Sequence, residues 1–158
     1  EAFSNTFVII RDFIRDQLSQ DPLDLLGSYF WERMLRVHEV FDKEKQDCNQ
    51  ELQKINWPSD VLYDAMEEIA CTNCGSSLVI PRNTDSTDIF DMKIQCRTCG
   101  NIMDFPDMAE ACLAEYMSWE VYLHYTDGNE LPLVDCTECS RIAYVVEENR
   151  CAICGYQK

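Results

Sequence analysis

Eight of the ten cysteines stand in four Cys-x-x-Cys pairs, a spacing typical of structural zinc sites. A tetrahedral zinc ion takes two thiolates from each of two such turns, whereas disulfides within the pairs would close only very small loops. Glycine, which allows a tight bend, follows the second cysteine in three pairs, and Ser140 follows it in the remaining one. We call each pair with its turn a knuckle.

The spacing of the knuckles predicts which of them share a metal. Between the first and second knuckles lie 21 residues, and between the third and fourth lie 11, both suited to a hairpin. The 36 residues between these two halves suit a connection instead. We therefore predict two zinc ions per chain, with interleaved ligation, in which the first knuckle pairs with the third, as the alternative. The predicted ligand sets are Cys71, Cys74, Cys96 and Cys99 for one ion and Cys136, Cys139, Cys151 and Cys154 for the other.

Four cysteine ligands make a closed site, which holds structure and leaves no open position for water or substrate. No His-x-Glu pattern accompanies the cysteines, so the signature of zinc deaminases is absent. The two remaining cysteines, Cys48 and Cys112, are interpreted as small buried residues on helices. Acidic neighbours, Asp47 for the first and Glu110 and Glu115 for the second, should raise the pKa of these thiols.

The residues before position 70 are predicted to be helical. Apolar residues recur at three- and four-residue steps from Phe3 to Leu18 and predict a helix over 2–19, which ends before Asp21-Pro22. A second apolar series predicts one long helix over 29–55, about 40 Å in length. We call this series the apolar stripe, and two short neighbouring helices would leave part of it uncovered. It consists of Phe30, Met34, Val37, Phe41, Cys48, Leu52 and Ile55.

The second half is predicted to consist of two small ribbons and a helix. Strands are expected over 77–80 and 89–94, around a polar loop at 81–88, and over 142–146. The predicted fold class is therefore α+β: an N-terminal helical segment followed by two four-cysteine zinc ribbons joined by a helix. The predicted segments are 1–70 (helical), 71–105 (first ribbon), 106–128 (linking helix) and 129–158 (second ribbon).

The linking helix, expected over 106–125, carries four aromatic residues that suggest base stacking or core packing. They are Tyr116, Trp119, Tyr122 and Tyr125. Met108 and Cys112 share one helical face with Trp119 and Tyr122, as in a helix that packs against its neighbours. We therefore predict that this face belongs to the core.

The charge of the chain disfavours binding to nucleic acid. The 158 residues include 13 Lys and Arg against 29 Asp and Glu, a net charge of −16 that is shared equally between residues 1–70 and 71–158. Two occupied four-cysteine sites would take this to about −20. Binding to phosphates depends on Lys and Arg, and the ribbon loops offer only Arg82, Arg97, Arg141 and Arg150. A basic protein is the more suitable partner.

A second motif whose residues could catalyse a reaction precedes the knuckles. It consists of Arg33, four further residues, and then His38. This pattern resembles the active motif of HEPN-family ribonucleases, which are small helical bundles, usually paired. The resemblance implies metal-independent RNA cleavage, in which Arg33 stabilises phosphate charge and His38 orients or protonates the reacting oxygens. On one continuous helix the two side chains would stand about 140° apart, so a joint site would form across a dimer cleft.

These observations predict a zinc-binding, non-catalytic protein that docks a protein partner, or a second copy of itself, through helix 30–55 and the ribbons. A HEPN-type endoribonuclease, toxin or antiviral, is the first alternative, and a nucleic-acid-binding zinc-ribbon protein is the second. No apolar run is long enough to span a bilayer and no secretory signal opens the chain, so we expect a cytoplasmic protein. Because Glu1 is not an initiator methionine, we also expect a segment before it.

Overall fold

The computed structural model describes residues 2–67, 69–82 and 89–158, with side chains from residue 6 onward except that of Ile89. It confirms the predicted mixture of helices and small sheets. The chain divides into two compact units, each assembled from separate segments. Unit 1 comprises residues 1–54, 70–81 and 95–102, and unit 2 comprises residues 55–69, 82–94 and 103–158. The boundaries of the four predicted segments stay predictions.

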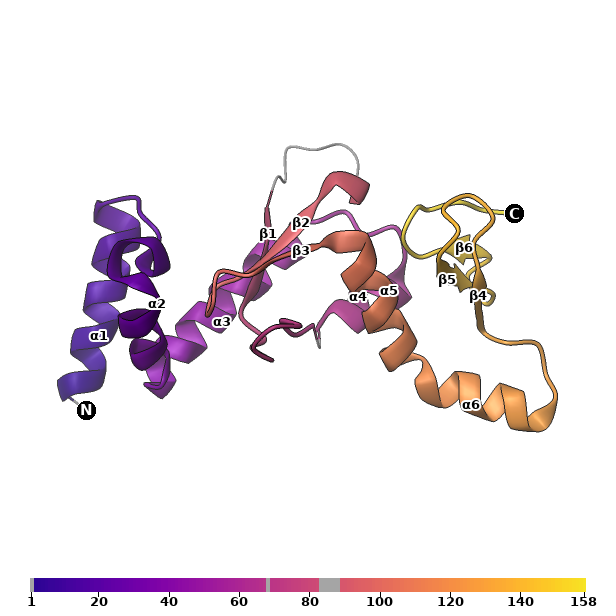
Figure 1. The fold of residues 1–158 in the computed structure, drawn as a ribbon, viewed down its shortest axis with the longest axis horizontal. Coiled ribbons are helices and arrows are strands. Elements are labelled where there is room, and N and C mark those ends of the chain that lie inside the picture. Colours follow the sequence, from indigo (N-terminus) through magenta and orange to yellow (C-terminus); the bar gives the residue numbers. More distant parts are fainter. Residues whose placement is uncertain (1, 68, 83–88) are drawn as a thin grey trace. The chain divides into compact units, whose positions relative to one another are not determined.

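Unit 1 contains the N-terminal helices (Figure 1). The helix predicted over 2–19 is present as α1, Ala2–Asp12, continued by a π-helical turn, η1, Phe13–Gln17. Phe3 of its predicted apolar face lies outside the side chains that the structure describes. The next helix, α2, Pro22–Leu35, begins where a helix start is favoured, with proline first and the Asp21 carboxylate accepting from the Leu23 N–H at 2.9 Å.

The prediction of one continuous helix over 29–55 is wrong. Val37 is extended (φ −86°, ψ 117°) and separates α2 from α3, His38–Gln53. The break allows α2 and α3 to contact each other, which buries Met34 and Cys48 in a common core. Most side chains of the apolar stripe are thus covered by other parts of the chain. Phe30, which is 63% exposed, is the exception.

The helices of unit 1 share their core with the first ribbon. Trp31 is fully buried, and Leu78, which follows the first knuckle, is buried in the same cluster. Ile80 packs against this cluster from strand β1, Val79–Arg82. The buried members are Leu23, Trp31, Met34, Leu35, Val40, Cys48 and Leu78. The two knuckles of the first ribbon and the N-terminal helices therefore belong to one compact unit.

The first sheet has the strand order β1-β2-β3, with β2 at Lys93–Cys96 and β3 at Ile102–Asp104. The strand predicted over 89–94 starts later than expected, because residues Ile89–Asp91 form a 3₁₀ turn, η2. Of the predicted loop over 81–88, Pro81 and Arg82 belong to β1, and residues 83–88 lie outside the described part of the chain.

Unit 2 combines three helices with the second ribbon. The helices are α4, Asp60–Glu67, α5, Phe105–Tyr116, and α6, Ser118–Asp127. The strands are β4, Leu133–Asp135, β5, Ile142–Val145, and β6, Arg150–Cys151, paired in that order as an antiparallel sheet. Helix α5 contacts both α4 and β5. Its Phe105 is fully buried, with its ring 5.7 Å from that of Trp57.

The predicted linking helix is two helices, and only the first belongs to the core. The break lies at Met117, where the backbone leaves helical geometry (φ −90°, ψ 7°). Of the predicted face, Met108 on α5 is buried and Cys112 on the same helix is half-buried. Trp119 and Tyr122 of α6 are instead 62% and 56% exposed, so the prediction that they pack in the core is wrong. Helical spacing indicates a common face but not whether anything covers it.

Candidate metal centres

The four knuckles have the same backbone geometry. In the first, the Cys71 N–H donates to the Ser76 carbonyl and the Gly75 N–H donates to the Cys71 carbonyl, both at 2.8 Å. The same pair of hydrogen bonds recurs around Cys96, Cys136 and Cys151. Each turn needs a left-handed residue after its second cysteine, and the four occupants are Gly75, Gly100, Ser140 and Gly155. Ser140 (φ 57°) adopts this conformation despite its Cβ.

The structure gathers the cysteine sulfurs in the two groups that the spacing predicts. In each group of four, the sulfurs all lie within 4.8 Å of one another. The Sγ–Sγ distances are 3.8 Å for Cys71–Cys99 and 3.6 Å for Cys74–Cys96. In the second group, Cys136–Cys154 measures 3.6 Å and Cys139–Cys151 measures 3.7 Å.

These distances suit a metal ion and not disulfides. A tetrahedron with zinc–sulfur bonds of about 2.3 Å has edges of about 3.8 Å between sulfurs. A disulfide would bring two sulfurs to about 2.05 Å, and all ten cysteines are free thiols. The knuckles pair first with second and third with fourth, not in the interleaved order. Both groups are therefore geometrically suitable for metal ions and consistent with zinc.

One thiol in each group is disposed to ionise before metal binds. Burial opposes ionisation of Cys99, but hydrogen bonds from the Asn101 backbone and the Asn73 side chain outweigh it and lower its pKa to about 7. Burial is likewise outweighed at Cys136, where backbone N–H groups of the same turn lower the pKa to about 7. Because zinc binds thiolates, each group offers an initial anchor for the ion at neutral pH.

The two cysteines outside the knuckles are not disposed to react. Burial first, and the charge of Glu44 next, raise the pKa of Cys48 to about 12. Burial, with the charge of Glu115, raises the pKa of Cys112 to about 11. Both pKa values are raised, as predicted, but burial is the main cause, and the carboxylate that raises the pKa of Cys48 is Glu44 and not the predicted Asp47. Cys48 is indeed a buried residue on a helix, while Cys112 on α5 is half-buried.

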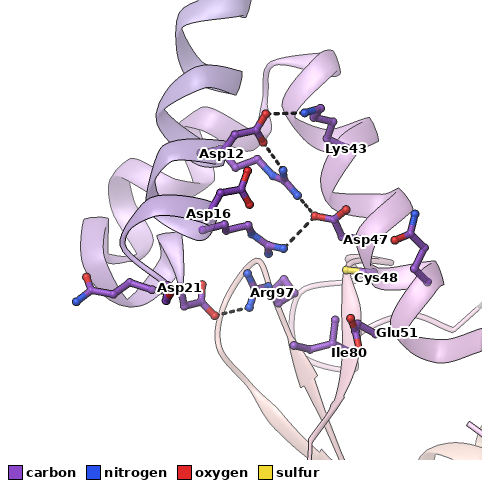
Figure 2. A pocket seen from close by; sticks show the side chains of 14 residues that line it. Asp12, Asp16, Asp21, Lys43, Asp47, Cys48, Glu51, Ile80 and Arg97 are labelled. Carbon is purple, nitrogen blue, oxygen red and sulfur yellow. Dashed lines mark hydrogen bonds and ion pairs between the residues drawn. The ribbon is translucent and has the colours of Figure 1, made fainter. Parts of the chain in front are cut away.

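Arg97, one of the two residues between the cysteines of the second knuckle, binds this knuckle to the helices of unit 1. The indole N–H of Trp31 donates to the Arg97 carbonyl at 2.6 Å. The Arg97 guanidinium donates through Nε to Glu44 at 2.9 Å. It also pairs with Asp21 (Figure 2). The turn that presents Cys96 and Cys99 is therefore held by one side chain from α2, one from α3 and the residue that caps α2.

Glu44 is the centre of this network. Its side chain is fully buried and accepts from three guanidinium groups, those of Arg11 at 3.0 Å, Arg15 at 2.5 Å and Arg97. Both N-terminal arginines also pair with Asp47. Burial, assisted by the charges of the other two arginines, lowers the pKa of Arg15. The network was not predicted, because its members come from distant positions and no local spacing marks them.

A pocket of about 580 Å³ opens beside this network and is lined mainly by charged side chains (Figure 2). Lys43 reaches Asp12 across it at 2.5 Å, and the lining arginines are those already paired with carboxylates. Opposite charges thus pair around the pocket, although the buried Nε of Arg15 has no hydrogen-bond partner among the described residues. We therefore interpret the pocket as part of the ion-paired contact between the helices and the first ribbon.

The second ribbon is held to unit 2 in a similar way. Arg141 follows the third knuckle and donates to Glu110 at 2.9 Å and to Asp107 at 2.7 Å. The Ile142 N–H also donates to Glu110 at 2.9 Å. The two carboxylates lie at the start of α5. In both units an arginine within or just after a knuckle therefore pairs with carboxylates on a helix or at its N-terminus.

The two residues of the HEPN-like motif lie on different helices, on either side of the break at Val37. Arg33 near the end of α2 is exposed and donates to the Tyr29 hydroxyl at 2.8 Å. His38, the first residue of α3, has an 84% exposed side chain and lies 2.6 Å from Asp42. A catalytic role for the pair stays a prediction.

Comparisons with protein-family models, with curated proteins and with solved structures find no match for this chain. Within the described residues, no helix has both the length and the apolar character needed to cross a membrane. The inference of function therefore depends on the geometry of the two sulfur groups and on the surfaces around them.

Proposed function

We propose that this chain is a zinc-binding, non-catalytic interaction protein that holds two zinc ions. The observation that carries this proposal is the closure of both metal groups. Each provides four cysteine sulfurs at tetrahedral spacing, which fills the coordination sphere of zinc and leaves no position for a substrate. The metal then has a structural task, and the function belongs to the surfaces that the ribbons and helices present.

The helical part of this surface is centred on the exposed end of the apolar stripe. Phe30 and Tyr29 are each 63% exposed on α2, with their rings 5.3 Å apart in an edge-to-face arrangement. Leu25, on the other side of the kink at Gly27 in α2, is also exposed. Exposed aromatic side chains of this kind are enriched at protein interfaces. We propose that a protein partner docks here, with a second copy of the chain as the alternative occupant.

Replacing Phe30 by glutamate tests this surface. We expect wild-type protein to associate, with itself or with a captured partner, more tightly as salt rises, because salt screens the repulsion between acidic chains while apolar contact persists. Phe30→Glu should abolish the association and change the free energy of unfolding by less than about 0.5 kcal/mol. Light scattering over a salt series measures the self-association.

Phe13→Glu, at another exposed aromatic position, on η1, is the matched control and should leave that association intact. Docking through this surface would be contradicted by two results together. Wild-type protein would stay monomeric at every salt concentration, and it would bind no partner that Phe30→Glu fails to bind.

The endoribonuclease is a second candidate, and one observation favours it. The break at Val37 removes the continuous helix that would have held Arg33 and His38 apart, and both side chains are exposed beside one turn. Nucleic-acid binding without catalysis has less support. Arg97 and Arg141, two of the few basic residues in the ribbons, are already paired with carboxylates.

Incubation with structured and single-stranded RNA decides between the two candidates. If the protein is non-catalytic, as we propose, these RNAs stay intact at protein concentrations far above those of an enzyme assay. Cleavage that is lost in Arg33→Ala and in His38→Ala, but kept in the control Arg36→Ala on the same turn, would establish the ribonuclease instead. Unchanged zinc content would show that the variants are folded.

A further inference from the structure

Helix α6 exposes an aromatic face that no described residue of unit 2 covers. None of its ten residues is buried, although α5 before it and β4 after it contribute to the core. Tyr125 is 77% exposed, and Trp119 and Tyr122 are more than half exposed. Figure 1 shows α6 in orange between α5 and the connection to β4. A short isolated helix is only marginally stable in water, so a covering partner would stabilise this one.

The aromatic side chains on α6 form a flat platform. The rings of Trp119 and Tyr122 are stacked, with centroids 5.5 Å apart and planes inclined by 24°. Leu123 lies four residues after Trp119 and therefore adjoins it on the helix surface. Tyr125 follows Tyr122 by three residues, the same interval that separates Tyr122 from Trp119. Stacked rings present the negative faces of their π-systems to any cation above them.

The platform lies in strongly acidic surroundings. Between Arg97 and Arg141 the sequence contains nine Asp and Glu and neither Lys nor Arg. Glu120 and Asp127 flank Leu123 at helical spacing, so both adjoin the platform. Four exposed carboxylates on and around α6 take part in no ion pair among the described residues, unlike those that hold Arg141. They are Glu115, Glu120, Asp127 and Glu130.

We propose that the platform on α6 docks a polypeptide segment rich in lysine and arginine. The rings would receive the cationic side chains through cation–π contacts, and the free carboxylates would pair with them. RNA, the other ligand that stacks on aromatic rings, is disfavoured because its phosphates would meet only acidic groups. A second copy would bring the same acidic surface and be repelled. This inference rests on the proposed interaction role but assigns it a surface distinct from Phe30.

A synthetic peptide of alternating arginine, lysine and glycine serves as the probe, with an acidic peptide of equal length and a single-stranded RNA as comparisons. Calorimetric titration of the zinc-loaded chain should show binding of the basic peptide alone. Trp119→Ala and Tyr122→Ala together should weaken it about tenfold, the scale of two cation–π contacts. The control Phe13→Ala removes an exposed ring from η1, outside both proposed surfaces, and should have no effect.

The charge contribution is tested separately by Glu120→Gln with Asp127→Asn, which keeps size and polarity. This variant should weaken binding and flatten its salt dependence, since fewer ion pairs form. Equal binding by the wild type and the aromatic variant, or preferred binding of RNA or of the acidic peptide, would overturn the inference. If no basic peptide binds while Phe30→Glu still disrupts association, the platform is excluded and the proposed interaction role stands.

Discussion

Replacing Cys74 by serine should remove one zinc ion per chain and unfold the helices of unit 1 together with the first ribbon. The first two knuckles share a core with α2 and α3, and Arg97 within the second knuckle binds Trp31 and Glu44. Binding of zinc to small four-ligand sites contributes about 10–16 kcal/mol, comparable to the whole stability of a domain of about 5–15 kcal/mol. Elemental analysis and circular dichroism would measure both losses.

Cys139→Ser is the matched variant in the other unit. It should also release one zinc ion, but the helices α1–α3 should persist, since no cysteine of the second site belongs to unit 1. Cys112→Ser, which alters a cysteine outside both groups, should retain both ions. Fewer than two zinc ions in wild-type protein, or full zinc content in Cys74→Ser, would disprove the assigned ligands.

Replacing Glu44 by leucine should destabilise unit 1 by about 3–5 kcal/mol, the typical cost of leaving buried charges without their partner. The arginine side chains of positions 11 and 97 are almost fully buried and would lose their central carboxylate. Urea denaturation in the presence of zinc would measure the change.

Glu51→Leu is the control, because Glu51 lies on the same helix, is 44% exposed and pairs only with Lys54 among the described residues. An exposed pair of this kind contributes about 0–1 kcal/mol. Adding Arg11→Leu to Glu44→Leu should restore part of the lost stability, since it removes one of the unpaired charges. A cost for Glu44→Leu no larger than that of Glu51→Leu would mean that the network is dispensable.

The metal groups could be predicted from the sequence because their information is local. Each knuckle is a short turn with its own hydrogen bonds, and hairpin-sized loops specify which turns meet. The helix over 2–19 was predictable for the same reason, since its apolar spacing ends at Asp21-Pro22. Fold class followed from these elements without knowledge of how they pack.

Features that depend on packing were not predictable. The apolar spacing of the stripe continues through Val37, and neither proline nor glycine marks the break between α2 and α3. Trp119 and Tyr122 have the spacing of a buried face, yet the break at Met117 separates them from the core that α5 joins. The Glu44 network unites residues 29 to 53 positions apart, which no periodicity records.

Because Arg97 is synthesised after the helices that it binds, its position affects the order in which the chain folds at the ribosome. Trp31 and Glu44 emerge first and then await a partner that follows 66 and 53 residues later. Until the second knuckle has been synthesised, the nascent helices carry a buried carboxylate whose set of cations is incomplete. Closure of this long loop is slow compared with the formation of local helices. If the first group of cysteines holds zinc, as we propose, capture of the metal would complete the packing of the knuckles against the helices, and cells short of zinc would accumulate incompletely folded chains.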